Sequence, residues 1–246
     1  MIKGIIFDLG GVLMHLGCRW REVDQVATAA LIDFLTANGI SVGENFAAVF
    51  NAARQQGWQL AEQTEIEQGM EAALRIALGP AADGRVRRLL PQAVETYFRV
   101  REQYWVSNPD ALQVLRTLSA RGLCLGAISN AEHDNLMQWS VARLGFSSYL
   151  HPVVTSARVK WRKPNPRIFQ YIAEEWSVDS TQIVMVGNVP WEDIAGAHRA
   201  GMRAVLIERR DTRQSYSIRH RSDDPVAAPD ATVETLAEIP AVIAQM

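Results

Sequence analysis

The C-terminal part of this chain alternates short apolar runs with amphipathic segments, and this alternation restricts the fold more than any other feature. From Asn108 onward, apolar runs of strand length are separated by stretches in which apolar residues recur every three or four positions. Strands that are apolar throughout are buried on both faces, as in parallel sheets that carry helices on each side. The sequence therefore predicts an α/β fold with a Rossmann-like parallel sheet and helices on both faces.

Six strands are expected in this sheet, one near the N-terminus and five in the C-terminal part. They cover residues 4–8, 123–129, 153–155, 183–186, 203–207 and 231–233. Two Asn-Pro pairs, at 108–109 and 165–166, predict helix starts, because asparagine is a good N-cap and proline fits the first helical position. Further helices are expected at residues 135–144, 191–200 and 235–244.

A segment with a different pattern separates the first strand from the second. From about Trp20 to Gln103 the apolar residues follow a helical period, with breaks at glycine and proline, and no strand is convincing. We expect a core domain of residues 1–16 and 106–246, interrupted by a small all-α cap domain of residues 17–105. The two crossings between these domains, at 14–19 and 104–108, are the candidate hinge for closing one lobe over the other.

Composition favours a soluble protein with a sizeable core and no large charged surface. The 25 Lys and Arg against 27 Asp and Glu give no reason to expect a nucleic-acid or membrane partner. The N-terminal apolar run is too short for a signal peptide, and no stretch approaches the ~18 apolar residues of a membrane span, so a cytoplasmic protein is expected. Cys18 and Cys124 match no metal-ligand spacing, and Cys124 is expected to be an inert buried thiol.

Polar side chains stand at the ends of strands that are far apart in the sequence. The carboxyl ends of parallel strands share one edge of the sheet, where open α/β sheets bind their ligands, so these side chains should meet in one crevice. They are Asp8 after the first strand, Ser129 and Asn130 after the second, Lys163 before the helix that precedes the fourth, and Asn188 and Asp193 after the fourth. An unpaired buried carboxylate costs several kcal/mol, so Asp8 is the leading site candidate.

Four motifs in this order resemble those of the haloacid dehalogenase (HAD) superfamily. They are Asp8 in an apolar strand, Ser129 in Ile-Ser-Asn, Lys163 in Arg-Lys-Pro-Asn-Pro, and the stretch from Gly187 to Asp193 that leads into Gly-Ala. The helical insertion is similar in position to the first type of cap domain in that family. The resemblance implies a hydrolase, most simply a phosphatase that acts on a small phosphorylated metabolite.

The chemistry expected of Asp8 is nucleophilic. An aspartate carboxylate can attack phosphorus to give an aspartyl-phosphate that water later hydrolyses, which replaces one difficult step by two easier ones. Lys163 would balance the charge of the nucleophile and the transferring group, and so act as a second catalytic residue. Ser129, Asn130 and Lys163 are the expected phosphate-binding residues, Ser129 because its hydroxyl lies where a strand turns toward a helix. The family resemblance implies the same roles.

Attack on a phosphate dianion by an anion requires charge neutralisation, and Mg²⁺ is the expected cofactor. Asp8, the backbone carbonyl of Gly10 and Asp193 are the expected ligands. Asn188 stands where the family often has aspartate; its amide oxygen can still coordinate, but one negative charge is lost. Metal affinity should therefore fall without vanishing.

Gly10 is the second departure from the phosphatase pattern of the family. The usual residue there is an aspartate that protonates the leaving group and later activates water, and glycine can do neither. Loss of such help typically costs 10²–10⁴-fold in rate. His15 and His133 are weak substitutes, and each is more simply explained as a loop or cap residue.

Three functions are therefore compatible with the sequence. The first is a Mg²⁺-dependent phosphatase. The second is a metal-independent 2-haloacid dehalogenase, in which Asp8 attacks carbon and neither a leaving-group acid nor a metal is needed; the family's dehalogenases usually carry a bulky aromatic residue where Gly10 stands. The third is a degenerate, non-catalytic member that binds a ligand or partner through its cap. The oligomeric state stays open.

Overall fold

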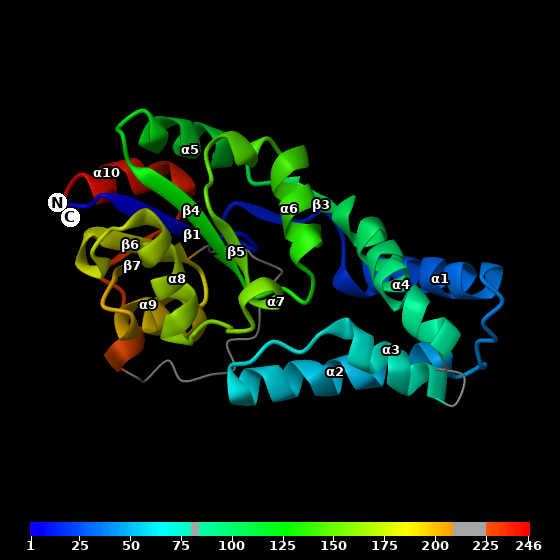
Figure 1. Cartoon of the computed structure of the whole chain (residues 1–246). Coiled ribbons are helices and arrows are strands. Elements are labelled where there is room, and N and C mark those ends of the chain that lie inside the picture. Colours follow the sequence, from blue (N-terminus) through cyan, green and yellow to red (C-terminus); the bar gives the residue numbers. More distant parts are fainter. Residues whose placement is uncertain (80–83, 209–224) are drawn as a thin grey trace.

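The computed structural model describes residues 1–79, 84–208 and 225–246, and a six-stranded parallel sheet lies at its centre (Figure 1). The strands are β1 (Gly4–Asp8), β4 (Cys124–Ser129), β5 (Val153–Thr155), β6 (Ile183–Gly187), β7 (Arg203–Ile207) and β8 (Ala231–Val233). Their order is β5-β4-β1-β6-β7-β8, and every neighbouring pair is parallel. The predicted fold class is confirmed. The first and last residues predicted for each strand differ from the observed ones by at most one residue.

The position of β1 in this order explains where a ligand would bind. After β1 the chain adds β4 and β5 on one side, then crosses to add β6, β7 and β8 on the other. Strand order thus reverses at β1, and the crevice beyond the carboxyl ends at such a point is where open α/β sheets bind ligands. Asp8 is the last residue of β1, and therefore it stands at this crevice.

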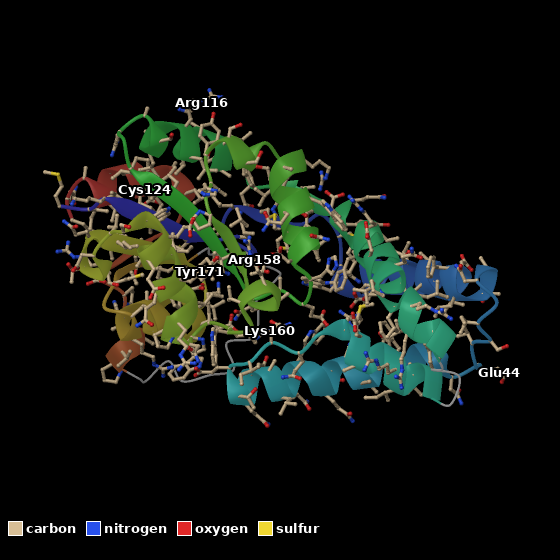
Figure 2. The ribbon with its side chains drawn as sticks, viewed as in Figure 1. Glu44, Arg116, Cys124, Arg158, Lys160 and Tyr171 are labelled. Atoms are coloured by element: carbon tan, nitrogen blue, oxygen red, sulfur yellow. The ribbon has the colours of Figure 1, made fainter. Side chains whose placement is uncertain are left out.

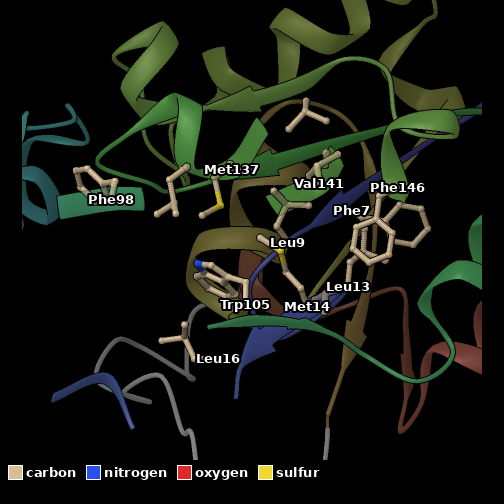
Figure 3. Packing of buried hydrophobic residues seen from close by; sticks show 14 of the residues in the cluster. Phe7, Leu9, Leu13, Met14, Leu16, Phe98, Trp105, Met137, Val141 and Phe146 are labelled. Carbon is tan, nitrogen blue, oxygen red and sulfur yellow. The ribbon is translucent and has the colours of Figure 1, made fainter. Parts of the chain in front are cut away.

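Helices cover both faces of the sheet, as predicted. They are α5 (Ala111–Ser119), α6 (Asp134–Arg143), α7 (Ser156–Val159), α8 (Pro166–Trp176), α9 (Ala195–Arg199) and α10 (Ile239–Ile243). Ile5 and Phe7 of β1 pack into the apolar cluster that contains α5, α6 and α10, part of which Figure 3 shows. Ile6 points to the opposite face, into the cluster formed with α8 and α9. A strand buried on both faces is the expected environment for its continuous apolar run.

The two Asn-Pro pairs behave differently. Asn165 caps α8, since its side chain accepts a hydrogen bond from the backbone N–H of Arg167 at 3.1 Å, and this prediction is confirmed. The predicted start at Asn108 is wrong, because α5 begins at Ala111. The Asn108 side chain is buried and instead bonds the backbone carbonyl of Val12 and the ring of His15. The Asn108 side chain thus forms hydrogen bonds to residues far away in the sequence instead of capping the helix that follows it.

Two of the remaining predicted helices are shorter than expected. The segment predicted as helix 191–200 opens with a wide π-helical turn, Pro190–Ile194, before α9. The segment predicted as helix 235–244 opens with a 3₁₀ turn, Leu236–Glu238, before α10, and Thr235 and Glu238 form a capping box there. In both segments the turn leads into a regular α-helix. The prediction of a helix is therefore correct, but the first turn of each is not α-helical.

In the described part of residues 17–105, the insertion after β1, four helices are present: α1 (Trp20–Ala37), α2 (Phe46–Thr64), α3 (Met70–Leu78) and α4 (Gly84–Glu102). They lie to one side of the sheet in Figure 1, with α4 alongside α1 and α6. We call residues 17–105 the cap; the domain boundaries themselves stay a prediction. The two crossing segments contain strands β2 (Met14–Leu16) and β3 (Trp105–Ser107), which pair with each other in an antiparallel sheet that the sequence pattern did not predict.

The expectation for Cys124 is wrong: the residue is exposed at the start of β4. Only this first residue of β4 is exposed, since the burial of the strand begins at Leu125. Among the described residues, no helix is long and apolar enough to cross a membrane.

Candidate active site

Three of the predicted residues meet at the carboxyl end of the sheet. Lys163 donates from Nζ to Asp8 Oδ1 at 2.7 Å and to Asp193 Oδ1 at 2.6 Å. The side chain of Lys163 is 2% exposed, that of Asp8 9% and that of Asp193 0%. One buried ammonium group thus bridges two buried carboxylates.

Asn130 fixes the backbone of the lysine. Its Oδ1 accepts a hydrogen bond from the backbone N–H of Lys163 at 2.8 Å, and its Nδ2 donates to the backbone carbonyl of Lys163 at 3.0 Å. The amide therefore joins the end of β4 to the residue that precedes α8, and both of its polar atoms serve this contact. A role of Asn130 in binding phosphate stays a prediction.

Asp193 is held from both sides. Its Oδ2 accepts hydrogen bonds from the backbone N–H groups of Asn188 and Val189, each at 2.9 Å, while its Oδ1 accepts from Lys163. A Cβ atom at Gly187 would come within 2.2 Å of the Asp193 Cβ, so only glycine allows this close approach. Among the described residues, Asp193 Oδ1 accepts one hydrogen bond and Oδ2 accepts two, so Oδ1 keeps a free lone pair. The predicted role of Asp193 as a metal ligand stays a prediction.

Burial dominates the electrostatics of the site. It raises the pKa of Asp8 to about 7, against the opposing effect of Lys163 and with a smaller contribution from Asp193. Burial also lowers the pKa of Lys163, but the two carboxylates more than compensate and hold it above its usual value. The ammonium group is therefore charged at neutral pH, whereas the protonation of Asp8 changes within the physiological range.

One buried oxygen atom without a hydrogen-bond partner bears on the predicted metal ligands. Asn188 Oδ1 is buried and has no hydrogen-bond partner among the residues that the structure describes. The amide lies against the turn that follows Asp8, because a Cβ at Gly11 would be 2.6 Å from Asn188 Nδ2. A carboxylate, an amide oxygen and the carbonyl of Gly10 are the hard oxygen donors that Mg²⁺ prefers, so these residues fit the ion. In the described ranges no three His, Cys, Asp or Glu side chains could hold a metal together, so water would complete the shell.

The structure does not require glycine at position 10. A Cβ there would lie 3.7 Å from Trp105 Cη2, which is ordinary van der Waals contact. The next residue is different: Gly11 has a φ of +82°, a conformation that side chains disfavour. The absence of an acid at Gly10 is therefore a chemical feature of the site rather than a demand of the turn.

The other sequence candidates are placed as follows. Ser129 is buried, and its Oγ lies 3.7 Å from Met137 Sδ, so its role in binding phosphate stays a prediction. His133 caps α6 by accepting a hydrogen bond from the backbone N–H of Leu136 at 3.2 Å, and burial lowers its pKa; the interpretation as a cap residue is confirmed. His15 lies in β2 rather than in a loop.

Two acidic residues near the site were not predicted from the sequence. Burial raises the pKa of Glu192, against the opposing effect of Lys163; the signal was present, since Glu192 directly precedes Asp193. Glu67 is a buried cap residue whose ion-pair partner, Arg162, is 95 positions away. No local pattern indicates such a pairing.

The site is thus a buried lysine between two aspartates at the switch point of a helix-covered parallel sheet. The chain matches the family model described as "haloacid dehalogenase-like hydrolase" over residues 2–201, and it belongs to that family.

Similar proteins include some named as phosphatases and some named as dehalogenases. Over 247 residues the chain is 28% identical to a glyceraldehyde 3-phosphate phosphatase of Methanopyrus kandleri, covering 100% of this chain and 99% of the relative. It is 37% identical over 220 residues to a protein of the same name from Methanothermobacter thermautotrophicus, covering 84% and 86%. A solved structure of a 2-haloacid dehalogenase from Pseudomonas syringae pv. tomato superposes with a TM-score of 0.73 at 27% identity, covering 100% and 99%.

Proposed function

We propose that the protein is a Mg²⁺-dependent phosphatase that hydrolyses a small phosphorylated metabolite through an aspartyl-phosphate on Asp8. The observation that carries this proposal is the buried ammonium group of Lys163 between Asp8 and Asp193. Such an arrangement supplies a nucleophile, fixed positive charge beside it and a second carboxylate that holds the cation in place. The relatives named as phosphatases, which match most of the chain, support the same activity.

Different residues of the chain have different roles in this reaction. Lys163 bonds Oδ1 of Asp8, and we assign the other oxygen, Oδ2, to the attack on phosphorus. A bond forms from Asp8 to phosphorus as the bond to the leaving alkoxide breaks, and water then cleaves the acyl phosphate to release phosphate. Asp193 and Asn130 keep Lys163 in position through its side chain and its backbone.

Mg²⁺ would be held by Asp8, the carbonyl of Gly10 and the orphaned amide oxygen of Asn188. When bound, the ion supplies positive charge that lets a phosphate dianion approach the carboxylate. With Gly10 in place of an acid, no side chain at that position protonates the leaving group. We therefore expect substrates whose leaving group is a good one to be hydrolysed fastest.

A 2-haloacid dehalogenase is the second candidate, and two observations favour it. Halide leaves as a stable anion and needs no proton, so Gly10 is no handicap; Asn188 in place of an acid suits a reaction without a metal. The solved dehalogenase structure covers the whole chain. In this case Asp8 would attack the carbon that carries the halogen, and water would then hydrolyse the ester on Asp8.

One experiment separates the candidates. Hydrolysis of 4-nitrophenyl phosphate is measured with Mg²⁺ and with EDTA for the parent, Asp8→Asn and Gly10→Asp, and halide release from 2-chloropropionate is measured in parallel. Phosphate release that requires both Mg²⁺ and Asp8 supports the phosphatase. Halide release in EDTA that requires Asp8 overturns it in favour of the dehalogenase, and turnover of neither substrate favours a non-catalytic member.

A further inference from the structure

A buried carboxylate of the cap reaches into the core close to the catalytic lysine. Glu67 lies between α2 and α3, yet its side chain is only 1% exposed. Its Oε2 accepts hydrogen bonds from two core residues, Ser156 Oγ and Arg162 Nη1, the second at 2.7 Å. Neither residue is assigned a part in the chemistry above.

The first of these contacts leads to the end of β4. Ser156 is fully buried at the start of α7, and its Oγ accepts a hydrogen bond from the backbone N–H of Ala131 at 2.9 Å. Ala131 directly follows Asn130. The carboxylate of Glu67 is thus one side chain away from the segment that clamps Lys163.

The second contact leads to Lys163 along the backbone. Arg162 precedes the lysine, and around it the cap and core pair as in an antiparallel sheet, with a bridge between Ile66 and Trp161. The backbone N–H of Glu67 donates to the carbonyl of Lys160 at 2.8 Å, and the N–H of Arg162 donates to the carbonyl of Glu65 at 3.0 Å. Figure 2 shows Lys160 on the side of the core that faces α2.

The two contacts close a ring. From Glu67 it runs through Ser156 to Ala131 and Asn130, across the paired hydrogen bonds to Lys163, and back through Arg162 to Glu67. Glu67 is the single member of this ring that belongs to the cap.

Because Glu67 is buried and Arg162 is largely buried, the ring of hydrogen bonds is stable only while the cap is in contact with the core. Breaking a buried ion pair leaves an uncompensated charge, which is strongly unfavourable, so Glu67 and Arg162 are stable here only together. When Glu67 is absent, Arg162 loses its ion-pair partner, and Ser156 Oγ keeps only the carbonyl of Ala131, at 3.2 Å, as an acceptor among the described residues. The segments before and after Asn130 and Lys163 then lose the one side chain that both contact. Docking of the cap and the position of the lysine are therefore linked.

We propose that Glu67 is a positioning residue for hydrolysis, which acts through Ser156 and Arg162 to hold Asn130 and Lys163 in place and completes the site only when the cap is docked. The proposal rests on the proposed function insofar as Lys163 is catalytic.

Kinetics give the first test, on whichever substrate the parent turns over. We expect Glu67→Ala to lower kcat about tenfold or more, because small displacements of catalytic groups carry large rate penalties, while KM changes by less than about threefold. Glu67→Gln keeps an oxygen for Ser156 and Arg162 and should recover part of kcat. The matched control is Glu71→Gln, a cap acid in α3 that is half exposed and, within the described residues, forms an ion pair only with Arg75 of its own helix; it should match the parent. A parent-like kcat in Glu67→Ala overturns the proposal.

Amide hydrogen exchange gives a second test that needs no turnover. The backbone N–H groups of Lys163 and Ala131 donate to Asn130 and Ser156, so their exchange reports the ring directly. We expect both to exchange at least about tenfold faster in Glu67→Ala, less so in Glu67→Gln, while Ile6 in the central strand stays unchanged. Unchanged exchange at Lys163 overturns the proposal even if the parent is inactive. Equal acceleration at Ile6 also overturns it, since that would show a general loss of stability.

Discussion

Lys163 Nζ lies 2.7 Å from Asp8 Oδ1, although the two residues are 155 positions apart in the sequence. Burial alone would keep the carboxyl group protonated, and the adjacent ammonium group favours the carboxylate. The pair therefore sets the fraction of Asp8 that is ready to attack.

The first prediction concerns pH. Asp8 must lose its proton to act as a nucleophile, and its pKa is raised to about 7, so kcat/KM should rise with pH through about 7 and level off above it. Added Mg²⁺ should move this limb to lower pH, since a bound cation favours the carboxylate. The measurement is a pH profile from 5 to 9; a flat profile would contradict the assignment.

The second prediction concerns the lysine. Lys163→Met should lower kcat about 10²–10³-fold and move the acid limb to higher pH, because the charge that lowers the pKa of Asp8 is gone. Lys163→Arg keeps the charge with a different shape and serves as the control for the direction of the shift. A limb that moves to lower pH in Lys163→Met would show that the lysine does not favour the carboxylate.

The third prediction is a gain of activity. Gly10→Asp should raise the hydrolysis of an alkyl phosphate at least about tenfold, since it restores a leaving-group acid where the structure leaves ordinary contact distance to Trp105. Gly10→Asn has nearly the same shape and no acid, so it should stay near the parent. Equal rates for the two variants would refute the role given to position 10.

The fourth prediction concerns the metal. Asn188→Asp adds a negative charge against the turn that follows Asp8 and should lower the Mg²⁺ concentration for half-maximal activity roughly tenfold. Asn188→Leu removes the buried oxygen and should raise it. Magnesium titrations of phosphate release check both, and an unchanged half-saturation in the two variants would place the ion elsewhere.

The fifth prediction concerns stability. Gly187→Ala should destabilise the fold by about 1–3 kcal/mol, because the new methyl group would overlap Asp193. Gly43→Ala is the control, since nothing lies within 4 Å of a Cβ at that position. Thermal unfolding compares the two; a parent-like Tm for Gly187→Ala would mean that Asp193 is free to move.

The sheet and the convergence of Asp8, Lys163 and Asp193 were predictable because strand ends are marked by local sequence. A buried apolar run followed by a polar residue indicates both the strand and the edge to which its end belongs. The positions that were mispredicted depend on distant partners. Asn108 bonds Val12 and His15 instead of capping a helix, and Cys124 is exposed although the rest of β4 is buried. The contact between Glu67 and Arg162 is of the same kind.

The central claim is that Asp8 forms a covalent intermediate. Its most direct test is mass spectrometry of the peptide that contains Asp8, after rapid acid quenching of the parent during turnover. We predict that this peptide gains the mass of one phosphoryl group from the aryl phosphate, and that the Asp8→Asn variant gains none. An unmodified Asp8 peptide during steady turnover, or an Asp8→Asn variant that keeps the parent's rate, would contradict the claim.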